Sequence, residues 1–555
     1  MRILLFISVA CCPSLAAAAT GALRTVALSG QPAPGTPSMA GFNAFSYTPV
    51  LNAAGQTAFL ATLQLGGDVT TENQFGIWSE GGGALALVAR QGSPAPGTPD
   101  GVSYGSSLTS IGLNNAGQTA FGGSLQGVGV IEDTDAGIWS ELNGPLELVA
   151  REGSQAPGAP AGAIFRSVGS TRLVDDRIAF TAGLQIGSGG VTGNDDTGVW
   201  SGNGGILDLV AREGSHAPGT PTGVIFSHFF LSWTPALGAG GQTGFSGFLR
   251  TGVSGATSSD DTGVWSEMDG ALTLVAREGS QAPGLPVGVK FSNFGPDFRA
   301  INGTGLVAFR GVLQFGEGVP GLNDSGIWSQ RSGPLALVAR EGDQAPGTPA
   351  GIVFGHFSNA PVLNAAGHTA FVGTLQRGDG GVTFSNNSGI WSDRSGTLEL
   401  VAREGNQAPG TPSGTNFDFM PRNSSIILNA AGQMAVFASL QSGSGGVNSS
   451  NNSGIWAEDV AGVLRLIVRT GDMLEVAPSD FRTVSSLSFR GDSGNEDGRG
   501  SGFNDLGQVA FSATFTDGSS GVFVSNLATV PEPMSLALGI VAVMLGTATM
   551  RHGLR

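Results

Sequence analysis

Lysine and cysteine are almost missing from this chain of 555 residues. Lysine occurs once, at Lys290, and charged residues make up 12% of the sequence, with a net charge of −16. Such an acidic surface disfavours nucleic acids and anionic membranes as partners. The two cysteines, Cys11 and Cys12, both stand close to the N-terminus. If that segment is removed, the mature protein has no thiol, which excludes disulfides and cysteine-ligated zinc.

The motifs of common catalytic sites are missing as well. The sequence contains neither GxSxG nor HExxH, and none of its five histidines recurs beside a carboxylate partner. Its glycine-rich stretches have the pattern of turns and do not stand between a strand and a helix, as a phosphate-binding loop would. We therefore predict that the protein is not an enzyme and that it needs no cofactor.

The N-terminus has the pattern of an export signal. Arg2 is followed by an apolar run, Ile3–Ala10, and then by small residues up to Ala19. This order of a basic residue, an apolar run and small residues is typical of a secretory signal peptide. We therefore divide the chain into a signal peptide at 1–19, a repetitive body at 20–529 and a tail at 530–555.

The tail itself has three parts. A short motif, Val530-Pro531-Glu532-Pro533, precedes an uncharged run of 17 residues at 534–550 and a basic end at 551–555. As a helix, that run is about 25 Å long, close to the roughly 30 Å of a hydrocarbon core, and it predicts a transmembrane helix whose basic end stays in the cytoplasm. A plain membrane anchor is one interpretation.

The same tail resembles the PEP-CTERM sorting signal of Gram-negative bacteria. This resemblance implies that an exosortase-type sorting enzyme recognises the tail. It also implies that the protein is exported and then anchored or processed at the cell envelope, at the cell surface or outside the cell.

One motif recurs through the body. The tryptophan of GIW or GVW stands at seven places separated by 61 to 65 residues, namely Trp78, Trp139, Trp200, Trp265, Trp328, Trp391 and Trp456. Each unit also carries a motif of the type LNAAGQTAF, first at 51–59, and most carry LVAREG after the tryptophan. A fixed period of this length marks a repeat architecture.

Each unit of about 63 residues predicts four antiparallel strands. An upstream strand meets the NxxGxxAF strand at a turn in which Asn bonds the backbone and Gly is left-handed. The GIWS and LVAR strands then meet at a glycine-rich hairpin. Such a meander is the blade of a β-propeller, with both long connections on one face and both tight turns on the other. We expect the tryptophans to pack between blades and the LVAR arginines to bond carbonyls or acidic groups.

The phase of the repeat predicts an all-β, eight-bladed β-propeller that closes on itself. NxxGxxAF-type and GIWS-type strands each occur eight times, but the last unit lacks its LVAR strand. An orphan copy of that strand, LRTVAL at 23–28, begins the mature chain. If this N-terminal strand pairs into the last blade, the ring hides two exposed sheet edges. An open β-repeat solenoid is the alternative.

Polar residues gather at two further places. The loops before GIW are rich in Asp and Asn, and calcium takes such oxygen ligands, although the DxDxDG spacing is missing and Asx turns use the same residues. The candidate calcium ligands are Asp133, Asp135, Asp195, Asp196, Asp260, Asp261 and Asp324. In the eighth unit, GDSGNEDGRGSG at 491–502 predicts a flexible polar insertion.

Over residues 23–526 the repeat resembles the tandem NxxGxxAF proteins that carry interchangeable anchoring tails, although the third and fourth copies lack the Asn. That family implies no activity. We therefore predict an exported surface or extracellular-matrix protein with a structural role, or one that binds a polysaccharide or another surface protein. Propellers build active sites from scattered loop residues, so an extracellular carbohydrate-active hydrolase or lyase is the alternative.

Overall fold

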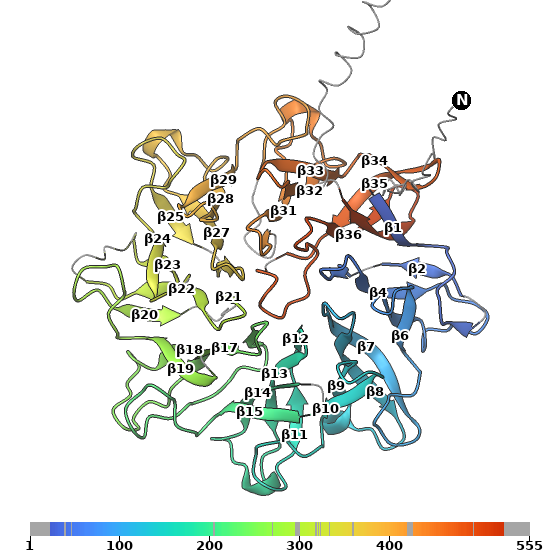
Figure 1. The fold of residues 1–555 in the computed structure, drawn as a ribbon, viewed down its shortest axis with the longest axis horizontal. Coiled ribbons are helices and arrows are strands. Elements are labelled where there is room, and N and C mark those ends of the chain that lie inside the picture. Colours follow the sequence, from blue (N-terminus) through green and yellow to red (C-terminus); the bar gives the residue numbers. More distant parts are fainter. Residues whose placement is uncertain are drawn as a thin grey trace, which may run out of the picture.

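The computed structural model describes residues 23–526, apart from 38–39, 46, 204–205, 269, 295–299, 317–318, 320, 322, 332, 358–359, 419–425 and 492. Eight separate antiparallel sheets surround a common centre, as the blades of a β-propeller (Figure 1). The predicted fold is confirmed, and the open solenoid is wrong. Within the described residues, no helix is long and apolar enough to cross a membrane. The predicted transmembrane helix, the sorting motif and the signal peptide lie outside them.

Each blade contains four strands that neighbour one another in chain order. The first strand, often interrupted, comprises β2 (Phe42–Ala44) and β3 (Val50–Leu51), β7 (Val102–Leu113), β11 (Phe165–Val168) and β12 (Arg172–Val174), β16 (Ala236–Leu237), β20 (Phe291–Phe294) and β21 (Ala300–Ile301), β25 (Phe354–Phe357) and β26 (Val362–Leu363), β30 (Ile426–Leu428), and β35 (Asp480–Ser488). The second strand is β4 (Thr57–Leu63), β8 (Thr119–Gly127), β13 (Arg177–Leu184), β17 (Thr243–Phe248), β22 (Val307–Leu313), β27 (Thr369–Leu375), β31 (Met434–Ser439) and β36 (Val509–Phe515).

The third strand carries the tryptophan motif in the first seven blades. It is β5 (Phe75–Ser79), β9 (Ala136–Ser140), β14 (Thr197–Asn203), β18 (Thr262–Met268), β23 (Ser325–Ser329), β28 (Ser388–Ser392), β32 (Ser453–Glu458) and β37 (Ser520–Ser525). The fourth strand is β6 (Ala86–Arg90), β10 (Glu147–Arg151), β15 (Ile206–Arg212), β19 (Ala271–Arg277), β24 (Ala336–Arg340), β29 (Glu399–Arg403), β33 (Leu464–Arg469) and β1 (Leu23–Leu28). Short 3₁₀ turns occur in the loops before the third strand, at η2 (Glu132–Thr134), η3 (Ser188–Gly190), η4 (Asp379–Gly381) and η5 (Ser444–Gly446).

The N-terminal strand closes the ring. β1 pairs antiparallel with β37, so that Leu23 lies opposite Ser525 and Leu28 lies opposite Gly521. The eighth sheet also gains a fifth strand, β34 (Met473–Ala477), on its other side. Figure 1 shows the blue first strand beside the red last strands. The described chain therefore begins and ends in one blade.

The seven repeat tryptophans form the core between neighbouring blades. Their side chains are fully buried, and each indole N–H donates to a proline carbonyl in the loop that leads out of the preceding blade, at 2.9–3.0 Å. The accepting prolines are Pro34, Pro96, Pro157, Pro218, Pro283, Pro346 and Pro409. Because burial satisfies both the ring and its polar N–H, each tryptophan joins two blades by packing and by a hydrogen bond.

The tight turns lie around the centre of the ring, whereas the long connections lie around its outside (Figure 1). The two long connections of a blade thus share one end of the strands, but this end points outward and does not form a face of the disc. The turn conformation itself is confirmed. The side-chain oxygen of Asn52 accepts from the amide of Gln56 at 3.0 Å, and Gly55 has a φ of 78°.

The asparagine of the turn also bonds the next blade. Asn52 donates its side-chain amide to the carbonyl of Asn114 at 3.0 Å, and Asn504 donates across the ring closure to the carbonyl of Asn52 at 2.9 Å. The same bond runs from Asn364 to Asn429 at 2.7 Å. These bonds link the inner ends of the blades. The predicted turn motif is therefore also an inter-blade contact, which the sequence pattern did not reveal.

The segment predicted to be a flexible insertion instead fills the centre of the ring, and that prediction is wrong. We call Ser493–Phe503 the hub loop; it is the red segment at the middle of Figure 1. Its carbonyls accept amides from blades seven, four, three and one, at Leu428, Leu237, Leu173 and Leu51.

The glycines of the hub loop allow this close approach. A Cβ on Gly494 would lie 1.8 Å from the carbonyl oxygen of Leu363, so only glycine fits there. Ser493, Asp497 and Ser501 are buried. A polar, glycine-rich composition therefore serves here to satisfy the inner sheet edges with backbone bonds.

Candidate functional site

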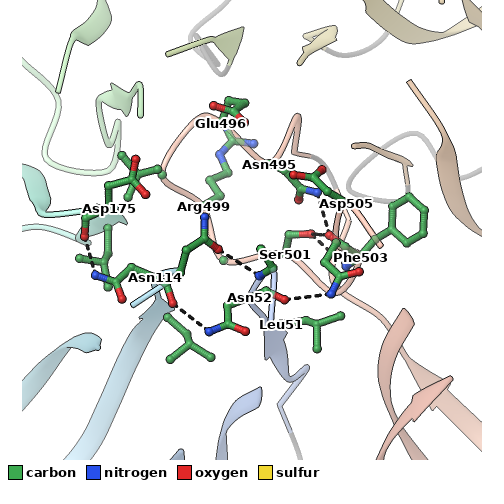
Figure 2. Close-up of a pocket in the computed structure, with 18 residues that line it drawn as sticks. Leu51, Asn52, Asn114, Asp175, Asn495, Glu496, Arg499, Ser501, Phe503 and Asp505 are labelled. Carbon is green, nitrogen blue, oxygen red and sulfur yellow. Dashed lines mark hydrogen bonds between the residues drawn. The ribbon is translucent and has the colours of Figure 1, made fainter. Parts of the chain in front are cut away.

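A polar pocket of about 70 Å³ opens between the hub loop and the turns of blades one, two, three and eight. The hub loop contributes Asn495, Glu496 and Arg499 to its lining (Figure 2). The turns contribute Asn52 and Asn114, together with Asp175 and Asp505. The pocket lies at the inner ends of the blades, where β-propellers bring loops from many repeats together.

Carboxyl groups dominate the charge of this hub pocket. Burial, and then the negative charges of Asp505, Asp175 and Asp497, raise the pKa of Glu496 to about 7. Burial also raises the pKa of Asp175. The guanidinium of Arg499 lies 3.6 Å from the carboxylate of Asp497, which also accepts from the hydroxyl of Ser493. The pocket thus offers a near-neutral proton donor and acceptor at Glu496 beside acidic groups.

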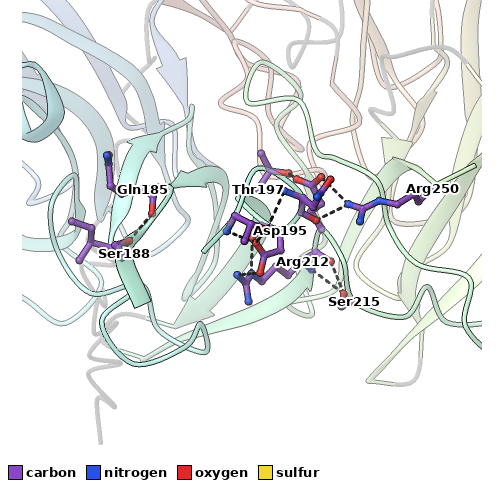
Figure 3. A network of polar contacts seen from close by, with 11 residues as sticks. Gln185, Ser188, Asp195, Thr197, Arg212, Ser215 and Arg250 are labelled. Carbon is purple, nitrogen blue, oxygen red and sulfur yellow. Dashed lines mark hydrogen bonds and ion pairs between the residues drawn. The ribbon is translucent and has the colours of Figure 1, made fainter. Parts of the chain in front are cut away.

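The candidate calcium ligands lie elsewhere, in the outer loops before the third strands. Asp195 caps a turn through the amide of Thr192 at 2.7 Å and bonds Arg212 at 2.8 Å, as Figure 3 shows. Asp260 makes the same contacts with Thr257 and Arg277. Asp133 lies in the 3₁₀ turn η2. These contacts are Asx turns and ion pairs.

The same loops confirm the prediction for the LVAR arginines. The Nε of Arg212 donates to the carbonyl of Asp195 at 2.8 Å, and that of Arg90 donates to the carbonyl of Asn73 at 2.7 Å. Each arginine therefore fastens the end of a fourth strand to the loop before the third.

The remaining aspartates each face a glutamate. Asp135, Asp196, Asp261 and Asp324 interact with Glu152, Glu213, Glu278 and Glu341, each 17 positions later in the chain. Burial above all, and then the neighbouring aspartate, raises the pKa of Glu152 to about 7. A carboxyl pair of this kind shares a proton near neutral pH.

The fifth such pair has an additional partner. The hydrogen bond from His356 at 2.9 Å helps to hold the pKa of Glu341 below its usual value, against the effect of burial. Among the described residues, no group of three or more His, Cys, Asp or Glu side chains is placed to hold a metal ion. The structure thus brings the candidate aspartates together with a basic residue or one glutamate each. Sequence reasoning missed the glutamates, although their fixed spacing was the available signal.

Several solved structures resemble this chain at low identity. Acylaminoacyl peptidase of Pyrococcus horikoshii is 10% identical with a TM-score of 0.34, and the match covers 85% of this chain and 58% of the peptidase. The β-propeller domain of the trilobed protease of Pyrococcus furiosus is 9% identical with a TM-score of 0.33, over 77% of this chain and all of that domain. A polysaccharide lyase of family PL25, an ulvan lyase, is 10% identical with a TM-score of 0.29, over 77% of this chain and 94% of the lyase.

No curated protein matches the sequence. One family model does, over residues 13–318 and again over 144–537, which together include nearly the whole repetitive body. The two overlapping matches follow from the repeats, because a model of several blades aligns in more than one phase. The chain therefore belongs to the Family of unknown function DUF7453.

Proposed function

We propose that this protein is an exported, envelope-anchored or exosortase-processed propeller that acts at the cell surface or in the extracellular matrix. Its role is structural or ligand-binding, without catalysis. The ligand is a polysaccharide or another surface protein.

One observation carries this proposal. Leu23 pairs with Ser525 in the eighth blade, and the Val530-Pro531-Glu532-Pro533 motif follows shortly after. The removed signal peptide and the sorting tail thus join the ring at one blade. A single tether there leaves the rims of the other seven blades free to meet a ligand.

The hub pocket favours a second candidate, a carbohydrate-active hydrolase or lyase. Glycan cleavage needs a carboxylic acid that is still protonated near neutral pH beside an ionised one. Glu496, with its pKa of about 7, and the neighbouring Asp175 and Asp505 are groups of the right chemistry.

One experiment separates the two candidates. The purified protein is applied to an array of bacterial and algal glycans, and the same polymers are tested for loss of chain length. We expect saturable binding without depolymerisation. Turnover that disappears in Glu496→Gln would contradict a non-catalytic role and support the hydrolase or lyase. Stoichiometric binding with no turnover would contradict the enzyme.

A further inference from the structure

The fourth blade carries an aromatic cluster that the repeat does not explain. The segment after Phe226 crosses toward blade three, where the amide of Phe229 donates to the hydroxyl of Thr197 at 3.0 Å. The carbonyl of Leu231 accepts from the hydroxyl of Thr181 at 3.2 Å. These two bonds hold the segment against the neighbouring blade.

Four rings meet on this segment and on β17, and we call them the aromatic shelf: His228, Phe230, Trp233 and Phe248. Phe230 and Trp233 lie 4.5 Å apart between ring centroids, and His228 is stacked on Phe248 at 4.7 Å. Phe230 is 42% exposed, and the other three rings are half-buried. Aromatic surface that is fixed in place yet left in water marks a binding site more often than a scaffold.

No other blade has the shelf. Register with the leucine that follows each second strand places Phe248 where the other blades have small or aliphatic residues, namely Thr62, Ser124, Gly183, Val312, Thr374, Ser439 and Thr514. Trp233 has no counterpart, whereas the other seven tryptophans are buried and bonded to prolines. A feature confined to one blade of a regular ring is not required for the fold of the others.

A recess of about 20 Å³ opens beside the shelf. Phe230, Trp233 and Thr181 line it together with Ser246. The hydroxyl of Ser246 is buried and has no hydrogen-bond partner within the described part of the chain. An unpaired buried hydroxyl costs free energy unless a water or a ligand group completes it. The recess is large enough for one water or one hydroxyl group.

We infer that the aromatic shelf binds an uncharged polysaccharide, with a pyranose ring stacked on Trp233 and Phe230 and one sugar hydroxyl reaching the recess at Ser246. The C–H groups on one face of a pyranose carry partial positive charge, and the face of an aromatic ring is negative, so the two attract. This inference rests on the proposed ligand-binding function and names its ligand class and place.

Charge and size argue against other occupants. Burial lowers the pKa of His228, so its imidazole is neutral and attracts no anion, and the carboxylate of Asp261 lies close to it. Glu213 lies behind Thr197, which bonds its carboxylate at 3.0 Å. An anionic glycan would therefore be repelled. A stable protein interface buries at least about 1,200 Å², far more than four rings offer.

The test measures binding to neutral polymers with the purified full-length protein. Soluble β-glucan, mannan and xylan are cast in native gels, with the anionic polymer alginate as a negative probe, and retardation is compared among variants. Trp233→Ala removes the ring. Phe248→Thr restores the residue used in blades one and six and so keeps the fold. Phe315→Ala, which removes an exposed ring of blade five, is the matched control.

We expect at least one neutral polymer to retard the protein and alginate to leave it unretarded. Trp233→Ala and Phe248→Thr should weaken binding about tenfold, and the control should not. In addition, acrylamide should quench mainly Trp233, because the other seven tryptophans are buried, and the bound polymer should protect it. Binding that is unchanged in both shelf variants would overturn the shelf while leaving a polysaccharide ligand standing. Failure of the unaltered protein to bind any neutral polymer would overturn the polysaccharide ligand itself.

Discussion

The inter-blade bond of the turn asparagine permits a quantitative test at the ring closure. The buried side chain of Asn504 accepts the amides of Leu506 and Gln508 within its own turn and donates to the carbonyl of Asn52 in blade one. Asn302 accepts the equivalent amides of its turn, but no bond from its amide nitrogen to the next blade occurs among the described residues. The two positions therefore differ chiefly in the contact between blades.

The expected losses follow from the bonds removed. Each hydrogen bond is worth about 1 kcal/mol, and a buried carbonyl left without a donor costs about 1–3 kcal/mol. Asn302→Ala should lower the free energy of unfolding by about 2–3 kcal/mol, and Asn504→Ala by about 3–4 kcal/mol. Asn504→Asp keeps the acceptor oxygen but turns a second oxygen toward the carbonyl of Asn52. It should therefore cost at least as much as the alanine.

Urea unfolding followed by tryptophan emission measures these differences, provided that the slope with urea stays the same in all variants. The excess loss of Asn504→Ala over Asn302→Ala is the decisive quantity. Equal losses at the two positions would refute a stabilising role for the bond between the first and last blades.

Three further predictions concern pH, the hub and the tail. The pKa of Glu152, raised to about 7, implies a contribution to stability that is complete below about pH 4.5 and is lost as pH rises through 7; Glu152→Gln should flatten this fall in unfolding midpoints, and an unchanged slope would contradict the shared proton. Gly494→Ala should destabilise the protein by more than 2 kcal/mol, about the cost of a displaced buried segment, because its Cβ meets the carbonyl of Leu363, whereas Gly82→Ala, with open space around it, should change the urea midpoint little. Glu532→Ala should leave an unprocessed, membrane-bound precursor on immunoblots of fractionated cells, and normal processing would argue against exosortase recognition.

The blade and the closed ring were predictable because both follow from local patterns. The period of the tryptophan motif and the orphan strand at 23–28 determine the number and the phase of the strands. The conformation of the NxxG turn was predictable for the same reason, since Asn and Gly have strong preferences within four residues.

Contacts between distant units were not predictable. The hub loop has the composition of a disordered segment, and only the inner edges of four blades, hundreds of residues away in the chain, give its backbone partners. The aromatic shelf likewise depends on His228 and Phe248 coming together across two strands. The glutamate partners of the loop aspartates were within reach, because their spacing of 17 is constant.

The hub loop also bears on how such an array can evolve. Tandem repeats gain and lose units by duplication and deletion, and a propeller accommodates either change by altering its diameter. Here eleven residues, Ser493–Phe503, span from blade seven to blades three and four through fixed backbone bonds. A ninth unit would carry those edges beyond the reach of the loop, and a seventh-only wheel would crush it. The segment therefore acts as a gauge that holds the count at eight.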